Sequence, residues 1–143
     1  MAGLRGKVGA LVLDADGLAK LAAGNSRAVS FAMDAYDSQT PVIVAASTLT
    51  EVLRGGPRDS PVHRVLRRIE ISPIDESKAR IAGELLGRVG LSGHDHAVDA
   101  LVAVVALAQP RPAVLLTSDT KDMGRLTDEP ERARRERIAV VRV

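Results

Sequence analysis

The chain has 143 residues, enough for one domain with a core that needs no disulfide or metal to hold it together. It contains no cysteine, which excludes disulfide bonds, thiolate metal sites and a cysteine nucleophile. Aromatic residues make up only 1% of the chain, which argues against a nucleic-acid-binding module that stacks bases on aromatic rings. The net charge of +2 permits a phosphate-rich partner but does not require one.

The apolar segments and the N-terminal residues predict a cytoplasmic protein without a membrane partner. The longest apolar run covers residues 100–108. That run is shorter than the roughly 20 residues that a helix needs to cross a bilayer. The first seven residues lack the apolar core and the cleavage site of a signal peptide.

The hydrophobic pattern alternates between strands and helices along the whole chain. In chain order we expect a strand over 8–13, helices over 17–22 and 25–35, a strand over 41–45, a helix from Thr48 to near Gly55, a helix over 61–68, a strand over 69–74, helices over 75–89 and 92–109, a strand over 113–117, a short helix after Asp119 and a strand over 138–143. This alternation predicts one α/β domain over residues 1–143, with three α/β/α layers and a mostly parallel sheet of about five strands.

In a sheet of this kind the functional crevice lies beyond the carboxyl ends of the strands. Asp14 follows the first predicted strand and Ser118–Asp119 follows the fourth. Each of these carboxylates has an alternative role as a helix cap. Glu51, three residues after Thr48, and Asp95, three residues after Ser92, have the spacing of capping boxes, and for Asp95 we favour the cap.

Asp99 is harder to explain as a structural residue. It lies in a helix that is apolar nearly all round, which predicts a buried position. A carboxylate there must find a partner or take up a proton, and the partners within one turn are His96 and Asp95. A salt bridge to a distant arginine is one alternative. A metal ion, or a group of acids around one, explains the residue better.

Four carboxylates on four separate elements form the candidate site: Asp14, Glu51, Asp99 and Asp119. Carboxylates that are brought together raise one another's pKa, so they favour a bound cation. An all-oxygen set suits Mg²⁺ or Mn²⁺, and the three histidines lack the spacing of a zinc site.

With these residues in place, the sequence resembles the PIN-domain ribonucleases, and most closely the VapC toxins of bacterial toxin–antitoxin pairs. Four short motifs carry the resemblance in the order of that family: Val12-Leu-Asp14-Ala-Asp16, Ser47-Thr-Leu-Thr-Glu51-Val-Leu-Arg54-Gly-Gly, Val98-Asp99-Ala-Leu-Val-Ala and Leu115-Leu-Thr-Ser118-Asp119. Each motif is weak alone, but the four together span nearly the whole chain and are fairly specific.

The resemblance implies a PIN-like fold and a role for each matching residue. Asp14, Glu51, Asp99 and Asp119 would hold the metal, with Asp14 and Asp99 as the principal ligands. Ser118 and Asp122 match secondary positions beside the site. Two departures stand out: Asp16 replaces a residue that is often small or hydroxylic, and His96 stands where many relatives have an acid, for which Asp95 is a possible substitute.

The resemblance also implies an activity and partners. One or two Mg²⁺ or Mn²⁺ ions would activate a water to cleave RNA, with no side chain as nucleophile. Arginines would grip RNA phosphates or a VapB-type antitoxin, with Arg54, Arg58 and Arg125 as candidates. Two arginine-rich segments, 54–68 and 125–137, are also explained as solvated faces, the second because Glu129, Glu131 and Glu136 balance it. We further expect a homodimer.

Two other readings stay open. In a phosphatase of the haloacid dehalogenase type, Asp14 would be the nucleophile and Asp16 the general acid; against this, Leu18 replaces an expected threonine and Lys121 is the single lysine after Ser118. The second reading is a protein that acts only through contacts, either a degenerate PIN-like domain or a receiver module. A receiver would use an aspartate after the third strand, where Asp75 lies.

Overall fold

The computed structural model describes residues 3–4 and 6–143. Its elements, in chain order, are β1 (Ala10–Leu13), α1 (Ala15–Ala22), α2 (Ser26–Asp37), β2 (Val42–Ala45), η1 (Ala46–Thr48), α3 (Leu49–Val52), η2 (Pro57–Asp59), α4 (Ser60–Leu66), β3 (Glu70–Ser72), α5 (Glu76–Val89), α6 (Gly93–Leu107), β4 (Ala113–Thr117), α7 (Thr120–Leu126), η3 (Arg134–Glu136) and β5 (Ala139–Arg142). Among the described residues, no helix combines the length and apolar character that a membrane crossing requires.

The five strands form one sheet in the order β3-β2-β1-β4-β5, and every neighbouring pair is parallel. The register places Leu13 opposite both Val44 of β2 and Leu116 of β4. The chain runs from β1 outward to β3, then returns to β4 on the other side of β1. The strand order therefore reverses between β1 and β4, which confirms the predicted α/β arrangement and marks the switch point where such sheets carry their sites.

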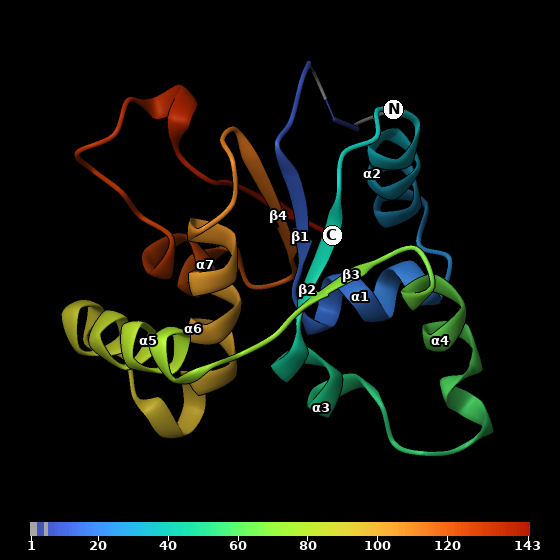
Figure 1. The fold of residues 1–143 in the computed structure, drawn as a ribbon, viewed down its shortest axis with the longest axis horizontal. Helices are drawn as coiled ribbons and strands as arrows, with labels where there is room; N and C mark the ends of the chain where they lie inside the picture. Colours follow the sequence, from blue (N-terminus) through green and yellow to red (C-terminus); the bar gives the residue numbers. More distant parts are fainter. Residues whose placement is uncertain (1–2, 5) are drawn as a thin grey trace.

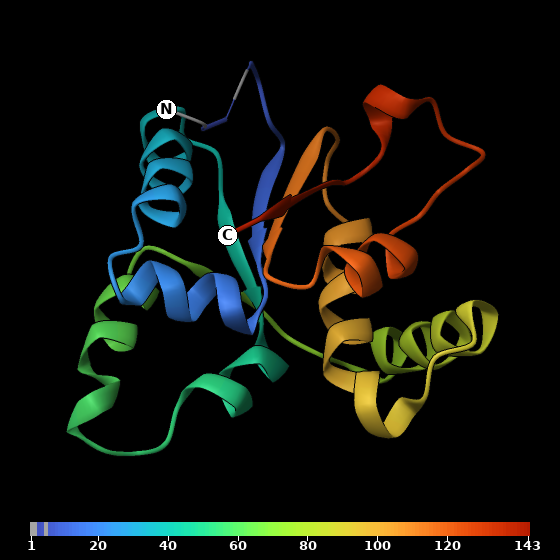
Figure 2. The same ribbon diagram turned by 180° about the vertical axis from the view of Figure 1, so that it is seen from behind.

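Helices cover both faces of the sheet and create two separate cores (Figure 1). Alternate residues of the central strands point to opposite faces, so Ala10 and Val12 of β1 pack against α5, α6 and α7. Leu11 and Leu13 instead pack against α1, α2 and α4. The view from behind in Figure 2 shows the same three layers, with the sheet between the two groups of helices. The three-layer prediction is confirmed.

Two local predictions are wrong, and a third differs only in length. The helix expected from Thr48 to near Gly55 is a single turn, because Leu53 is already extended, with φ −86° and ψ 140°. Neither Thr48 nor Ser92 forms a capping box, because neither side chain makes a cap hydrogen bond. The strand expected over 69–74 is confirmed but shorter: β3 is an edge strand whose residues are exposed or half-buried.

One glycine allows the switch point to close. A Cβ on Gly17 would lie 2.8 Å from the backbone carbonyl oxygen of Leu116, at the end of β4. Any larger residue would push α1 away from β4, because backbone cannot move aside as a flexible side chain does. Gly17 thus lets the first turn of α1 pack directly on the strand whose end carries Ser118 and Asp119.

Candidate active site

Asp14 occupies the centre of the switch point. It follows β1 directly and ends the strand by capping α1: its Oδ1 accepts a hydrogen bond of 2.8 Å from the Gly17 amide. The capping role that the sequence allowed for Asp14 is therefore real. Its side chain is also on the α6 side of the sheet by strand alternation, together with Thr117 of β4, with which it shares a hydrogen bond.

The surroundings of Asp14 disfavour its charge. The residue is only 6% exposed, and burial raises the pKa of its carboxyl to about 6. The negative charges of Asp16 and Asp99 raise this pKa further, while hydrogen bonds from Thr117 and Gly17 lower it. A capping aspartate normally has a lowered pKa, because amide donors favour the ionised form. The opposite shift here shows that neighbouring acids and burial outweigh the cap.

The end of β4 contributes a tight turn beside Asp14. The Ser118 hydroxyl donates a hydrogen bond to the Asp16 carboxylate, which joins the ends of β1 and β4. Asp119 caps α7, its Oδ1 accepting from the Asp122 amide at 3.0 Å, and its own amide donates to Thr117 Oγ1 at 3.0 Å. The cap leaves Asp119 Oδ2 without a bond among the described residues.

Asp99 and Asp122 approach each other through a histidine. His96 Nδ1 lies 3.6 Å from Asp99 Oδ2 and 3.8 Å from Asp122 Oδ2. Partial burial raises the pKa of Asp99, contacts with His96 lower it, and the charges of Asp119 and Asp122 raise it. The expectation of a buried Asp99 is wrong, since its side chain is 33% exposed. No arginine or lysine pairs with it in the described part of the chain.

Glu51 approaches the same group of acids from the rim. It lies in the single turn α3, and its pKa is raised by desolvation and then by the charges of Asp99 and Asp16. The Arg54 charge lowers that pKa. The Arg54 guanidinium donates to the carbonyl oxygens of Thr50, Glu51 and Leu53 and so caps the end of α3.

The structure thus brings most of the predicted acids near one another. The pKa values of Asp14, Glu51 and Asp99 are raised in part by the negative charges of neighbouring acids, which include Asp16, Asp119 and Asp122. Their oxygen donors suit a hard cation by charge and by type. Within the described ranges, no three His, Asp or Glu side chains already form a group that could hold a metal ion. Ligation would therefore require these side chains to turn inward.

Three predicted residues lie apart from this group or serve other contacts. Asp95 is exposed and, among the described residues, has no hydrogen bond or ion pair; His96, not Asp95, lies between the other acids. Arg58 is also exposed, in η2, with no such contact in the described chain. Arg125 donates to the Val89 carbonyl at 2.5 Å and lies 4.0 Å from Asp122, so it links α7 to α5 at the rim of the site.

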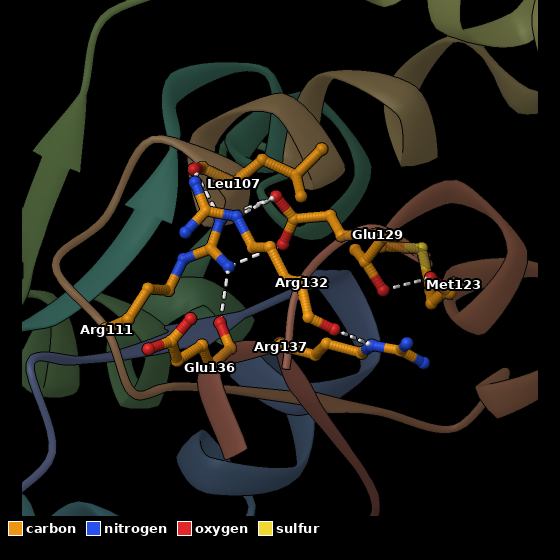
Figure 3. A network of polar contacts seen from close by, with 8 residues as sticks. Leu107, Arg111, Met123, Glu129, Arg132, Glu136 and Arg137 are labelled. Atoms are coloured by element: carbon orange, nitrogen blue, oxygen red, sulfur yellow. Dashed lines mark hydrogen bonds and ion pairs between the residues drawn. The ribbon is translucent and has the colours of Figure 1, made fainter. Parts of the chain in front are cut away.

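In the described part of the chain, one arginine of the second arginine-rich segment pairs with an acid of that segment, Arg132 with Glu129, and Glu129 also pairs with Arg111 from outside it (Figure 3). Arg111 forms a pair with Glu129, bonding both carboxylate oxygens, with side chains only 11% and 14% exposed. Arg132 bonds the same glutamate, and Arg137 donates to the carbonyl oxygens of Pro130 and Arg132. These contacts fix the segment between α7 and β5.

Sequence reasoning missed three residues that shape the site. Thr117 forms hydrogen bonds with both Asp14 and Asp119. The sequence feature that could have indicated this role is its position at the end of a buried strand. Asp59 is buried because its carboxylate accepts from the amides of Arg54 and Gly55, which closes the loop after α3. Arg142 donates to the Ser118 carbonyl and the Thr120 hydroxyl, and no local pattern in the sequence indicates that contact.

Comparisons with known proteins identify the architecture. No protein-family model and no curated protein matches the chain. A chain in the crystal structure of VapBC2 from Rickettsia felis bound to a promoter DNA fragment superimposes with a TM-score of 0.65 at 17% identity, over 93% of this chain and 98% of that one. A chain of a toxin–antitoxin complex from Klebsiella pneumoniae gives a TM-score of 0.58 at 22% identity, over 79% and 89% of the two chains. The chain therefore has the PIN-like α/β/α fold found in these toxin–antitoxin complexes.

Proposed function

We propose that the chain is a metal-dependent endoribonuclease that acts as the toxin of a type II toxin–antitoxin pair. The observation that carries this proposal is the convergence of Asp14, Asp99 and Asp119, from three elements far apart in sequence, at the switch point of the sheet. The shared fold with chains of two toxin–antitoxin complexes supports the same assignment.

Asp14, Asp99 and Asp119 would hold one or two Mg²⁺ or Mn²⁺ ions, with Glu51 at the rim. The fit rests on the all-oxygen donor set and on the raised pKa values of Asp14, Glu51 and Asp99. A bound cation would lower these pKa values, because its positive charge favours ionised carboxylates. When bound, such an ion lowers the pKa of a water and offsets charge on a phosphodiester.

The residues of the chain itself supply positioning. Thr117 and Gly17 orient the Asp14 carboxylate, and the contact between Ser118 and Asp16 joins the ends of β1 and β4. Arg54 is exposed next to Glu51 and carries a charge that no carboxylate in the described chain pairs directly. An RNA phosphate is an acceptor of the kind that this guanidinium would bind.

The most direct test is RNA cleavage by the purified chain with Mg²⁺ or Mn²⁺ and after removal of the metal with EDTA. Asp99→Asn keeps the side-chain volume and removes the charge, so we expect loss of cleavage with the fold retained. Asp95→Asn is the matched control, because it makes the same change on the same helix outside the cluster. Cleavage that survives Asp99→Asn or EDTA would overturn the proposal.

For the antitoxin we propose a docking groove between α1, α2 and α4. The groove has a volume of about 260 Å³ and an apolar floor with two arginines at its edge; it is lined by Leu21, Val29, Ala32, Met33, Tyr36, Arg64, Val65 and Arg68. Met33 is 46% exposed, and the Arg68 guanidinium lies 3.8 Å from the centre of the Tyr36 ring. This chemistry fits an amphipathic segment that bears acidic side chains.

Co-purification with the product of the adjacent upstream gene tests this groove. Met33→Glu should abolish co-purification, because it places a charge on the apolar floor. Ile81→Glu is the control, since Ile81 is similarly exposed but lies on α5, on the other face of the sheet. Equal binding by both variants would contradict the proposed groove. The same preparation, run on a sizing column, tests the expected homodimer.

Two alternatives make different predictions. A phosphatase would form a covalent phosphate on Asp14 and would need a lysine in its site. Lys121, the single lysine after Ser118, is exposed and has no hydrogen bond or ion pair in the described chain. A degenerate PIN-like domain would show no metal-dependent rise in melting temperature. Asp75, the aspartate that a receiver would use, caps α5 by accepting from the Lys78 amide at 2.9 Å.

A further inference from the structure

Arg142, near the end of β5, reaches across to the turn that carries Asp119. Its Nη1 donates to the Ser118 carbonyl oxygen at 2.9 Å, and its Nη2 donates to Thr120 Oγ1 at 2.9 Å. Arg142 pairs with Thr117 in the register of β4 and β5, so its side chain starts at the same edge of the sheet as Asp14. The guanidinium thus spans the turn on both sides of Asp119.

We propose that Arg142 is a positioning residue, which fixes the Ser118–Thr120 turn so that Ser118 meets Asp16 and Asp119 faces the other acids. This inference rests on the proposed function and deepens it. The two bonds come from one planar fork, which sets both the distance and the direction of the turn.

The contacts around the turn show why it needs an external support. The Asp119 amide donates to Thr117 Oγ1, and the Asp119 carboxylate caps α7. Both contacts are with neighbours of Asp119 in the sequence, at the end of β4 and the start of α7. The Ser118 carbonyl oxygen and the Thr120 hydroxyl lie at the outer side of the turn, where solvent would otherwise compete. Without Arg142 the turn loses both outer bonds.

The kind of partner that Arg142 binds gives a second argument that it positions the turn. In the described part of the chain Arg142 has no carboxylate within ion-pair distance, and the residue is exposed. The contacts of the Arg142 guanidinium in the described chain are therefore with the turn itself. An arginine that served only to pair an acid would sit against a carboxylate; this one binds a carbonyl and a hydroxyl.

The test compares Arg142→Gln and Arg142→Lys with Arg137→Gln. Arg137 is a matched control, because it is a partly exposed arginine that also donates to two oxygens, but in the loop before β5. For both Arg142 variants we expect kcat to fall at least about tenfold with KM within about twofold, since misplacement of a reacting group acts mainly on the chemical step. Arg142→Lys keeps the charge but loses the fork, so it should not restore kcat.

A second readout needs neither metal nor substrate. In Arg142→Gln, the amides of Asp119 and Asp122 should exchange with deuterated solvent faster than in the wild type, while those of β1 stay protected. Full kcat in Arg142→Gln, with unchanged exchange at these amides, would overturn the inference. Full rescue by Arg142→Lys would show that charge alone matters and would overturn it too. If the wild type itself cleaves no RNA, the proposed function fails, while amide exchange still decides whether Arg142 fixes the turn.

Discussion

The substitution Asp14→Asn gives the sharpest test of the electrostatics of the site. Asparagine keeps the size of the side chain and an oxygen that accepts from the Gly17 amide, so the cap of α1 is preserved. It removes the negative charge that burial and the charges of Asp16 and Asp99 disfavour. We therefore expect the metal-free variant to be more stable than the wild type at neutral pH, although it lacks a proposed ligand.

The raised pKa of Asp14 gives the magnitude. A shift from 3.8 to about 6 corresponds to roughly 3 kcal/mol against the ionised form in the folded state. Asn loses part of this gain because it is a weaker acceptor, so we expect a net stabilisation of about 1–3 kcal/mol at pH 7. For a domain of this size that is a rise in melting temperature of about 3–10 °C.

The pH dependence has a defined sign. Because the folded pKa of Asp14 lies above its unfolded value, the folded wild type binds the extra proton, and its stability falls as pH rises from about 4 to about 6. The advantage of Asp14→Asn should therefore be absent near pH 4 and complete above pH 7.

Thermal unfolding of both proteins in metal-free buffer at several pH values measures this advantage directly. Added Mn²⁺ should raise the melting temperature of the wild type by mass action and that of the variant much less. A variant that is less stable at pH 7, or equally shifted at pH 4 and pH 8, would refute the account of the site as mutually repelling acids.

Two further predictions concern the frame around the site. Gly17→Ala should destabilise the protein by about 1–3 kcal/mol, since its Cβ would meet the Leu116 carbonyl, whereas Gly124→Ala, with no atom near the added Cβ, should be neutral or stabilising in urea unfolding. Glu129→Gln should cost about 2 kcal/mol at pH 7 by weakening the pair with Arg111. Burial acts to raise the pKa of Glu129, but the two arginines bonded to it hold that pKa below its usual value, so the cost should shrink as pH falls through this lowered pKa.

The sheet and its site edge could be predicted from sequence because they follow from local patterns. The apolar runs that stop at Asp14 and at Thr117 mark buried strands, and alternation with helices makes those strands parallel. The position of the switch point then follows from the position of the first and fourth strands. Asp14 and Asp119 lie at this edge of the sheet, as the pattern predicts, and their role as ligands stays a prediction.

The remaining features depend on contacts between distant residues. A capping box at Thr48 looked sound locally, yet the Thr48 side chain is fully buried and makes no cap bond, because tertiary packing determines how α3 begins. The place of His96 between two acids depends on how α6 meets α7, and the reach of Arg142 depends on how β5 pairs with β4. No window of sequence contains both partners.

The parallel pairing of β1 with β4 has a consequence for the timing of synthesis. Residue 14 can meet residue 117 only after the ribosome has made about a hundred further residues, because two helical layers and two strands intervene. A growing chain that has completed β1, β2 and β3 thus has a sheet with one vacant side and an unfinished pocket. Any activity that needs the ends of both β1 and β4 therefore begins only after most of the chain has been translated.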